Sequence, residues 1–368
     1  MADFLQGFFR GKRVFLTGHT GFKGAWLSAW LLELGADVAG YALAPNTSPN
    51  LFGLLGLQKK MRHTLGDVAD GAKLAKALKA HRPQIVIHMA AQALVRPSYQ
   101  DPVGTYRTNV LGTANLLDAA RAAKSVRSVV SVTSDKCYEN KEWAYGYRET
   151  DPMGGHDPYS ASKGCAELVT ASYRNSFFNE AGVGLGSGRA GNVVGGGDWS
   201  KDRLVPDCAR AFSAGKTIEL RNPAATRPWQ HVLEPLAGYM LLAARLYENP
   251  RRYGMGWNFG PESDSILTVG QVVERVRSLW GRGAVRVLTA KQPHEARFLR
   301  LDASQARDLG WKPVWDIDAC LSATVSWYRA HYEKSGDLDV LTRRQIGTYT
   351  EAAARAGLSW ALPKGKKG

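Results

Sequence analysis

The chain is poor in cysteine and holds no long apolar run. Its four cysteines are spread over 368 residues without the spacing of a metal site or a redox motif: Cys137, Cys165, Cys208 and Cys320. We therefore expect free thiols, a reducing cytoplasm and no metal centre. No stretch approaches the roughly 20 apolar residues that span a bilayer, and residues 1–13 lack the apolar core of a signal peptide. The sequence predicts no membrane association.

Acidic residues are also few relative to basic ones. Asp and Glu number 33 against 48 Lys and Arg, which gives a formal net charge of +15. Such an excess favours anionic partners, but no block of five like charges occurs anywhere in the chain. We expect a solvated basic surface that binds phosphorylated small molecules rather than nucleic acid.

The first half of the chain alternates strand patterns with helical ones. Strands are expected at 13–17, 37–42, 85–89 and 128–133, and helices at 24–34, 72–81 and 113–124. Strands that recur with helices between them imply right-handed crossovers and a parallel sheet covered on both faces. The predicted fold class is therefore α/β, with a doubly wound parallel sheet of the Rossmann type.

The pattern changes after about residue 190. Loops rich in Gly, Pro and Trp there separate helices expected at 232–248, 269–280 and 317–332. A length of 368 residues is enough for about two domains. We predict a cofactor-binding domain over 1–190 with later segments crossing back, a smaller α/β substrate domain over 191–340, and a C-terminal extension over 341–368 with a disordered tail.

A glycine-rich segment, Gly18-His19-Thr20-Gly21-Phe22-Lys23-Gly24, follows the first expected strand directly. Glycines there allow a tight turn and close approach of the backbone to a diphosphate, and a helix N-terminus supplies free N–H groups. A place between the first strand and the first helix favours a dinucleotide site over ordinary turn glycines. The spacing G-x-x-G-x-x-G resembles that of the extended short-chain dehydrogenase/reductase superfamily. We expect cofactor contacts from Gly18, Thr20, Gly21, Phe22, Lys23 and Gly24.

The acid that commonly binds the adenosine ribose is missing. No Asp or Glu lies between Asp37 and Asp67, and the turn over 45–48 holds no arginine for a 2′-phosphate. By elimination Asn46, Thr47 or Ser48 would meet the ribose. We predict NAD as the cofactor, with Asn46 as a contact.

Two further segments are candidates for the cofactor site. Asp67 and Val68 resemble the place where the superfamily binds adenine, although an acid in a loop after a strand is an equally good interpretation. Small residues after the strand over 85–89 let a cofactor lie against the backbone. This segment is Ala90, Ala91 and Gln92.

A tyrosine and a lysine lie one helical turn apart at Tyr159 and Lys163. A phenol with a pKa of about 10 is a poor base at neutral pH, but a neighbouring ammonium favours its phenolate form. Ser134, at the end of the strand over 128–133, supplies a hydroxyl that can hold the substrate oxygen. Ser134, Tyr159 and Lys163 behind a glycine loop predict NAD-dependent oxidation of an alcohol, with Tyr159 and Lys163 also contacting the cofactor.

The residues after the serine, Asp135 and Lys136, separate the reaction types. Oxidation or 4-epimerisation needs only the hydroxyl, Tyr and Lys, whereas elimination of water needs a second proton-transfer group. Asp135 provides such an acid. Nucleotide-sugar 4,6-dehydratases carry an Asp followed by a Glu at this place, and this chain has Lys136 instead of the Glu.

The chain resembles the nucleotide-sugar 4,6-dehydratase family over about residues 8–335. Besides the glycine loop, the resemblance rests on four segments: Thr133 to Tyr138, Arg189 to Trp199, Arg227 to Val232 and Pro293 to Ala296. It implies CDP-glucose as the substrate, with oxidation at C4, loss of water across C5 and C6 with Asp135 as the acid, and reduction at C6. The C5 base is left open between Lys136 in its neutral form and Tyr159 with Lys136 stabilising the enolate.

The resemblance also implies where the substrate binds. Asn192 and Arg227 would meet the diphosphate, Arg203 and Leu204 the nucleotide, and His294 and Glu295 its ribose or base. It further implies a homodimer, or a higher homo-oligomer, built on the helices over 113–124 and 160–178. The alternatives are a 4,6-dehydratase or 4-epimerase for another nucleotide sugar and a non-enzymatic module that binds NAD or nucleic acid.

Overall fold

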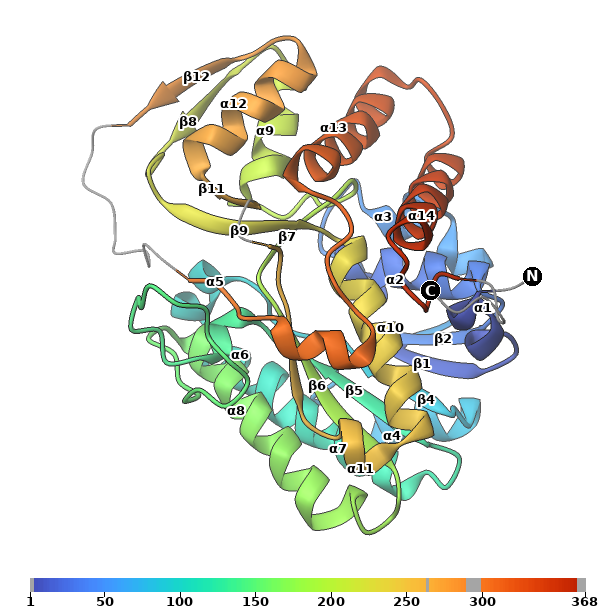
Figure 1. The fold of residues 1–368 in the computed structure, drawn as a ribbon. Coiled ribbons are helices and arrows are strands. Elements are labelled where there is room, and N and C mark those ends of the chain that lie inside the picture. The colour runs from blue at the N-terminus through green and yellow to red at the C-terminus, as the bar shows by residue number, and fades with distance from the viewer. Residues whose placement is uncertain (1–2, 263–264, 289–298, 363–368) are drawn as a thin grey trace.

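The computed structural model describes residues 3–262, 265–288 and 299–362. Its centre is a seven-stranded parallel sheet in the order β10-β6-β5-β4-β1-β2-β3 (Figure 1). The strands are β1 (Arg13–Thr17), β2 (Asp37–Ala42), β3 (Arg62–Leu65), β4 (Ile85–His88), β5 (Ser128–Val132), β6 (Gly184–Ala190) and β10 (Gly256–Phe259). This order confirms the predicted doubly wound fold. Because β1 lies beside β4, the loops after these two strands diverge and leave room for a ligand.

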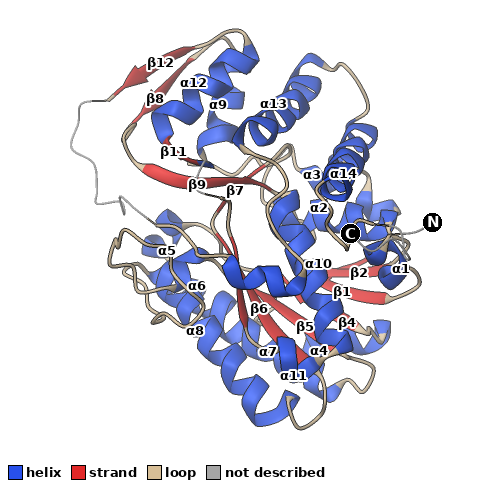
Figure 2. Ribbon diagram, viewed as in Figure 1, coloured by secondary structure: helices blue, strands red, loops and turns tan. Residues whose placement is uncertain are grey.

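Helices cover both faces of this sheet (Figure 2). One face carries α1 (Phe4–Phe9), α2 (Phe22–Glu33), α10 (Leu233–Glu248) and α11 (Pro250–Tyr253). The other carries α4 (Gly71–His81), α7 (Gly112–Ala122) and α8 (Pro158–Tyr173), with α5 (Val95–Gln100) and α6 (Pro102–Tyr106) against α8. Single π-helical turns, η2 (Arg107–Leu111) and η4 (Arg174–Phe178), precede α7 and extend α8.

A smaller domain lies beyond the carboxyl ends of the parallel strands (Figure 1). Its two small sheets are β11-β9-β7 and β12-β8, built from β7 (Asn192–Val194), β8 (Thr217–Leu220), β9 (Thr226–His231), β11 (Ile266–Thr268) and β12 (Ala284–Val287). Its helices are α9 (Leu204–Ser213), α12 (Val269–Trp280) and α13 (Ile317–Glu333). Short elements connect the larger ones: α3 (Leu51–Leu54), η1 (Leu57–Lys59) and η6 (Ser304–Leu309).

The last helix, α14 (Leu338–Arg355), returns to the first domain and packs on α2. The ring of Tyr349 on α14 lies 5.8 Å from that of Trp30 on α2. The boundary that the sequence placed between residues 340 and 341 therefore falls inside a helix. Strand β10 likewise lies at the edge of the first domain's sheet, although it follows residue 190.

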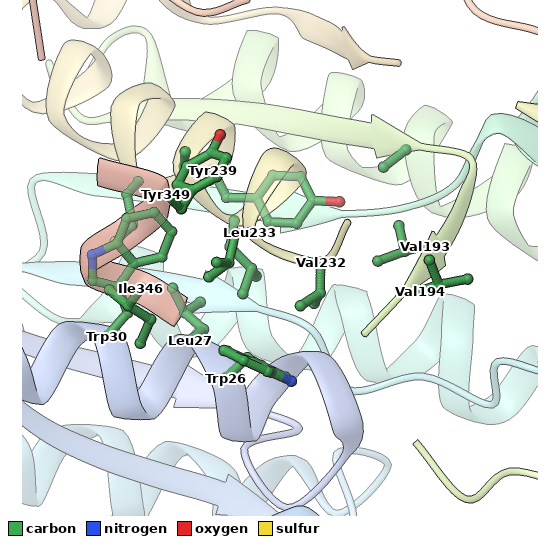
Figure 3. Close-up of a cluster of buried hydrophobic side chains, with 14 of the residues drawn as sticks. Trp26, Leu27, Trp30, Val193, Val194, Val232, Leu233, Tyr239, Ile346 and Tyr349 are labelled. Atoms are coloured by element: carbon green, nitrogen blue, oxygen red, sulfur yellow. The ribbon is translucent and has the colours of Figure 1, made fainter. Parts of the chain in front are cut away.

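A buried apolar cluster joins the two domains (Figure 3). Trp26 on α2 is fully buried and donates its indole N–H to the Gly196 carbonyl, 2.8 Å away, in the segment after β7. Leu233 on α10 and Val194 on β7 belong to the same cluster. Because a buried side chain of this size stabilises by about 2 kcal/mol or more, the cluster holds the helix of the glycine loop against the substrate domain.

The sequence is poor in cysteine and lacks long apolar runs, and the structure agrees with both observations. All four cysteines are free thiols, and three of them are buried. Within the ranges that the structure describes, no helix is both long enough and apolar enough to cross a bilayer. The same ranges contain no group of three or more His, Cys, Asp or Glu side chains that could hold a metal ion.

Candidate active site

The glycine loop lies where β1 and β4 end side by side. Gly18 has a φ of +77°, and its N–H donates to the Tyr41 carbonyl at 2.9 Å. A Cβ at Gly18 would lie 2.7 Å from the backbone nitrogen of Ala90, which directly follows β4 and Met89. A side chain at Gly18 would therefore push the two loops apart.

Helix α2 starts with its first amide groups uncapped by any side chain. Gly21 is the N-cap residue and has no side chain that could accept from the first N–H groups. A Cβ at Gly24 would lie 2.1 Å from the Gly18 carbonyl oxygen, so the helix presses against the loop. Free N–H groups at a helix N-terminus beside a backbone without side chains are what a diphosphate requires. These residues fit a dinucleotide cofactor.

The predicted adenosine contacts lie at the ends of β2 and β3. Thr20 donates to the Leu43 carbonyl at 2.8 Å, which ties the glycine loop to the segment that leads to exposed Asn46. Asp67 accepts the Ala69 N–H at 2.9 Å and pairs with Arg107 at 3.3 Å. Asp67 thus has local structural partners of its own, and its contact with adenine stays a prediction, as does that of Asn46.

The other predicted cofactor contacts, Val68 and the segment from Ala90 to Gln92, are fixed by contacts within the first domain. Val68 is buried, and a Cβ at Gly112 would lie 2.6 Å from its side chain. The Gln92 N–H donates to the Asn109 side chain at 2.8 Å, and the Ala90 N–H lies 3.2 Å from the Thr17 hydroxyl. The segment from Ala90 to Gln92 is therefore fixed next to the glycine loop.

Helix α8 presents Tyr159 and Lys163 on one face. Asp157 caps its first turn by accepting from Ser160, and Tyr159 is 8 % exposed. A Cβ at Gly164 would lie 2.9 Å from the Gly154 carbonyl oxygen, so glycine lets the helix approach the loop after β5. Burial lowers the pKa of Lys163 to about 8.

Tyr159 meets the serine of the turn after β5. Burial raises the pKa of Tyr159 to about 12, while a hydrogen bond with the Ser134 side chain and the charge of Arg203 act in the opposite direction. The structure therefore brings Ser134 and Tyr159 together as the sequence predicted. Burial favours the phenol form of Tyr159, so a role as a base depends on a neighbouring cation that stabilises the phenolate.

Asp135 and Lys136 form the short 3₁₀ turn η3 (Asp135–Cys137) directly after Ser134. The Ser134 hydroxyl donates to Asp135 Oδ1 at 2.9 Å. A Cβ at Gly191 would lie 2.9 Å from Asp135 Oδ2, which places the carboxyl against the backbone between β6 and β7. Burial raises the pKa of Asp135, and the Lys136 ammonium acts against this. A carboxyl with a raised pKa fits the role of a proton donor.

Lys23 lies between the predicted cofactor and substrate sites. Burial and the nearby charges of Arg203 and Lys163 lower its pKa to about 8. The carboxylates of Asp135 and Asp198 act on it in the opposite direction. Lys23 is thus within electrostatic reach of the catalytic groups, and not only of the glycine loop to which the sequence assigned it.

The predicted substrate residues that the structure describes fall into two groups. Asn192 begins β7 next to Gly191 and so lies beside Asp135, and the charge of Arg227 on β9 also reaches that carboxyl. Arg203 precedes Leu204 at the start of α9, with its Nη2 atom 3.5 Å from the Ala93 carbonyl oxygen. The remaining two, His294 and Glu295, lie outside the described residues.

A buried ion pair beneath these groups escaped the sequence reasoning. Glu167 and Arg189 are about 5 % exposed, and Arg189 Nη2 lies 2.7 Å from Glu167 Oε2. Glu167 follows Lys163 by one helical turn, so the spacing Tyr159, Lys163, Glu167 would have marked a third polar position on the same face.

Comparisons with known proteins agree with this geometry. The GDP-mannose 4,6-dehydratase family model matches residues 15–324. The CDP-glucose 4,6-dehydratase of Salmonella typhimurium is 50 % identical, covering 95 % of this chain and 99 % of that protein. The dTDP-glucose 4,6-dehydratase of Streptomyces griseus is 29 % identical, covering 86 % and 94 %.

Solved structures show the same fold. The dTDP-glucose 4,6-dehydratase of Streptomyces venezuelae, solved with NAD and TYD bound, has a TM-score of 0.75 at 26 % identity, covering 88 % of this chain and 98 % of that one. The Thermus thermophilus UDP-glucose 4-epimerase in complex with NAD has a TM-score of 0.75 at 25 % identity, covering 86 % and 99 %. The chain belongs to the nucleotide-sugar 4,6-dehydratases that the GDP-mannose 4,6-dehydratase model describes, within the extended short-chain dehydrogenase/reductase superfamily.

Proposed function

We propose that this protein dehydrates CDP-glucose to CDP-4-keto-6-deoxyglucose, with NAD as a cofactor that is regenerated in each turnover. The observation that carries the proposal is the 50 % identity, over 95 % of the chain, with a CDP-glucose 4,6-dehydratase. The acid Asp135 beside Ser134 supports elimination over simple oxidation or epimerisation. The product is a precursor for CDP-linked deoxysugars of the kind found in bacterial surface polysaccharides such as the O-antigen of lipopolysaccharide.

Each proposed catalytic residue has a separate role in the reaction. Tyr159, as its phenolate, accepts the proton of the C4 hydroxyl, and the ammonium of Lys163, one helical turn away on α8, favours that form. Ser134 holds the same oxygen. Held by the glycine loop, NAD would supply the acceptor for the C4 hydride and, once reduced, the donor of that hydride to C6. Asp135, in its protonated form, donates to the departing C6 hydroxyl.

The C5 proton needs a base, and we propose Lys136. It lies in η3 beside Asp135, half-buried, where the related dTDP-sugar enzymes carry a Glu. A neutral amine can remove a proton that the C4 ketone has made acidic. If Lys136 stabilises the enolate instead, Tyr159 moves the proton.

Solvent exchange distinguishes the two assignments. In deuterated water the native enzyme introduces deuterium at C5, and Lys136→Ala should lose most of this exchange. Asp135→Asn serves as the matched control, since it blocks loss of water without removing the base. Near-normal exchange in the Lys136→Ala protein would show that a group other than Lys136, with Tyr159 as the candidate, is the base.

The CDP moiety is proposed to bind through the cations between the two domains. Asn192 adjoins Gly191, which lies against Asp135, the charge of Arg227 reaches the same carboxyl, and Arg203 lies at the start of α9. Guanidinium groups suit the planar oxygens of a diphosphate. The predicted contacts from His294 and Glu295 to the ribose or base remain part of this proposal.

The test of the function is a product assay with a panel of nucleotide sugars. Purified protein with NAD is incubated with CDP-glucose, UDP-glucose, dTDP-glucose and GDP-mannose. We expect a 4-keto-6-deoxy product from CDP-glucose, identified by its absorbance in alkali, by mass and by NMR. An epimer as the product, or a preference for another sugar nucleotide, would overturn the proposal. Titration with NAD and NADP tests the cofactor choice, which a preference for NADP would contradict.

We also propose a homodimer through the helices beside the active site. Apolar residues gather in a shallow groove over α6, η2 and α7, lined by Val103, Tyr106, Val110, Leu111 and Ala114. Leu168 on α8 is 61 % exposed, and Phe177 after it is 39 % exposed. Light scattering should give twice the chain mass, and Leu111→Asp should give a monomer. A native protein that stays monomeric would contradict this assembly.

The cellular setting follows from the same proposal. We place the enzyme in the cytoplasm, where NAD is available and where its four free thiols would persist. Most of the charge of +15 then has no role in catalysis and lies on the solvated surface. We expect no salt-dependent binding of DNA or RNA.

A further inference from the structure

The buried ion pair Glu167–Arg189 is the strongest polar feature that the proposed chemistry does not use. It lies beneath the active site, between α8 and the carboxyl ends of β5 and β6. Both side chains are about 5 % exposed. Burying two charges is unfavourable unless each is paired and hydrogen-bonded, so the partners of the pair show what it holds in place.

Glu167 is bonded through both of its carboxylate oxygens. Its Oε1 atom accepts from the Thr133 hydroxyl. Its Oε2 atom accepts from the Ser187 hydroxyl at 2.6 Å and from Arg189 Nη2 at 2.7 Å. Thr133 directly precedes Ser134, so Glu167 holds the residue at which the catalytic turn begins.

Arg189 is bonded on the other side of the same turn. Its Nη1 atom donates to the Tyr138 hydroxyl at 2.7 Å and to the Glu149 carbonyl at 3.0 Å. The Tyr138 hydroxyl in turn donates to Asn258 Oδ1 at 2.7 Å. Tyr138 directly follows η3, so Arg189 holds the residue at which the catalytic turn ends.

The ion pair thus touches both ends of the segment that carries Ser134, Asp135 and Lys136. Glu167 also belongs to α8, one turn after Lys163 and two turns after Tyr159 on the same face. The two halves of the catalytic apparatus come from segments that β5 and α8 place separately. Within the described part of the chain, this pair connects them through charge-assisted hydrogen bonds.

We propose that Glu167 and Arg189 are positioning residues for the dehydratase reaction. They clamp the segment Thr133–Tyr138 to helix α8 and so set the distance from Ser134 and Asp135 to Tyr159. This inference rests on the proposed function, because it concerns the geometry of that same reaction. A misplacement of about 1 Å between reacting groups can lower a rate about 100-fold without changing how the substrate binds.

The charge of Glu167 also affects Lys163. Burial lowers the pKa of Lys163 to about 8, and the Cys137 thiol and the Glu167 carboxylate act in the opposite direction. The other groups near Lys163 are Lys23 on α2 and His88 on β4, and Tyr159 on the same helix. Replacing Glu167 with a neutral side chain removes the carboxylate and leaves Arg189 uncompensated. Both changes lower the pKa of Lys163, so the alkaline limb of the rate profile moves to lower pH.

Glu167→Gln tests the proposal in the full-length enzyme with CDP-glucose. We expect kcat to fall about 100-fold, KM to stay within about threefold, and the alkaline limb of kcat against pH to move to lower pH. Glu234→Gln is the matched control, since it makes the same chemical change at a buried carboxyl on α10 away from the site. It should leave kcat and the pH profile unchanged. A Glu167→Gln enzyme with native kcat and native pH profile would overturn the clamp.

Two milder variants keep the proposal testable if Glu167→Gln does not fold. Neither variant removes a charge. Thr133→Val removes the hydrogen bond to Glu167, and Tyr138→Phe removes the hydrogen bond from Arg189 together with the one to Asn258. Each should lower kcat about tenfold with native KM, and native kcat in both would overturn the proposal.

The native enzyme is measured in the same assays. If it fails with CDP-glucose but dehydrates another sugar nucleotide of the panel, the proposed substrate is wrong. The clamp is then judged by the same ratios of variant to native kcat on that substrate. If the native enzyme dehydrates no member of the panel, the proposed function and the clamp are overturned together. Native activity with an unaffected Glu167→Gln variant overturns the clamp alone.

Discussion

Two buried glutamates, on helices that cover opposite faces of the central sheet, differ in how their charge is compensated. Glu167 under the active site pairs with Arg189. Glu234 on α10 is fully buried, and its carboxyl accepts from the N–H groups of Val314 and Trp315 and from the Tyr349 hydroxyl. No cation accompanies it among the contacts that the described residues make.

The difference is visible in the direction of the two pKa shifts. Burial would raise the pKa of Glu167, but the charge and the hydrogen bonds of Arg189 hold it below its ordinary value. Burial raises the pKa of Glu234 to about 7, because three donors compensate only part of the desolvation. The first site keeps a fixed charge for catalysis, whereas the second joins the C-terminal segment to the core and titrates near neutrality.

The largest expected effect lies on the active-site side, at Asp135. Asp135→Asn keeps the hydrogen bond from Ser134 but removes the proposed proton donor for the C6 hydroxyl. We expect turnover of CDP-glucose to fall about 1,000-fold. The midpoint of urea unfolding should stay close to native, since the change keeps the shape of the side chain and the acceptor for the Ser134 hydroxyl and removes a buried acid. A large loss of stability would show that Asp135 resembles Glu234 more than a catalytic group.

The second largest effect is expected on stability, at Glu234, which contacts the C-terminal segment. Glu234→Ala leaves the N–H groups of Val314 and Trp315 and the Tyr349 hydroxyl without their acceptor. We expect the free energy of unfolding to fall by about 3 kcal/mol, measured by urea denaturation. Turnover at 25 °C should stay within twofold of native. If turnover falls as it does for Asp135→Asn, the two regions are not separate in function.

The pH dependence of stability is a further test of the difference between Glu167 and Glu234. The pKa of Glu234 is higher in the folded chain, at about 7, than the ordinary value of 4.5 in the unfolded chain. Its contribution is therefore fully present below pH 4.5 and is lost as the pH rises through about 7. We expect Glu234→Gln to remove a decline on the order of 3 kcal/mol between pH 5 and pH 8. An unchanged slope in this variant would contradict the titration of Glu234.

The smallest effect is expected at an exposed ion pair. Arg275 on α12 lies 2.7 Å from Asp318 on α13, and Asp318 is 75 % exposed. Water screens such a pair, so Asp318→Asn should change the free energy of unfolding by less than about 0.5 kcal/mol. A loss comparable to that of Glu234→Ala would show that burial does not explain the difference between these sites.

Many of the helices and strands could be predicted from local patterns. The strands expected at 13–17 and 37–42 coincide with β1 and β2, and the helix expected at 269–280 coincides with α12. These segments carry continuous apolar runs or a clear helical period, so neighbouring residues suffice to identify them. The order of Ser134, Tyr159 and Lys163 indicated the chemistry for the same reason.

Strand β6 could not be predicted in this way. Its sequence, Gly184 to Ala190, holds three glycines and no β-branched residue, yet it lies fully buried between β5 and β10. A Cβ at Gly188 would lie 2.7 Å from the ring of Tyr239, and one at Gly184 would lie 2.5 Å from the Leu246 carbonyl oxygen. Glycine is needed there because α10 packs directly on the strand, a contact that local sequence does not reveal.

The sequence by itself determined four strands of the first domain's sheet, the glycine loop and the family, and it predicted the catalytic residues. These depend on periodicity and spacing within short stretches of chain. Only the tertiary structure decided that Glu167 meets Arg189, that Asp135 lies against Gly191, and that α14 returns to α2. Such contacts join residues that are distant in sequence, and their energies come from burial and charge pairing that exist only once the chain has folded.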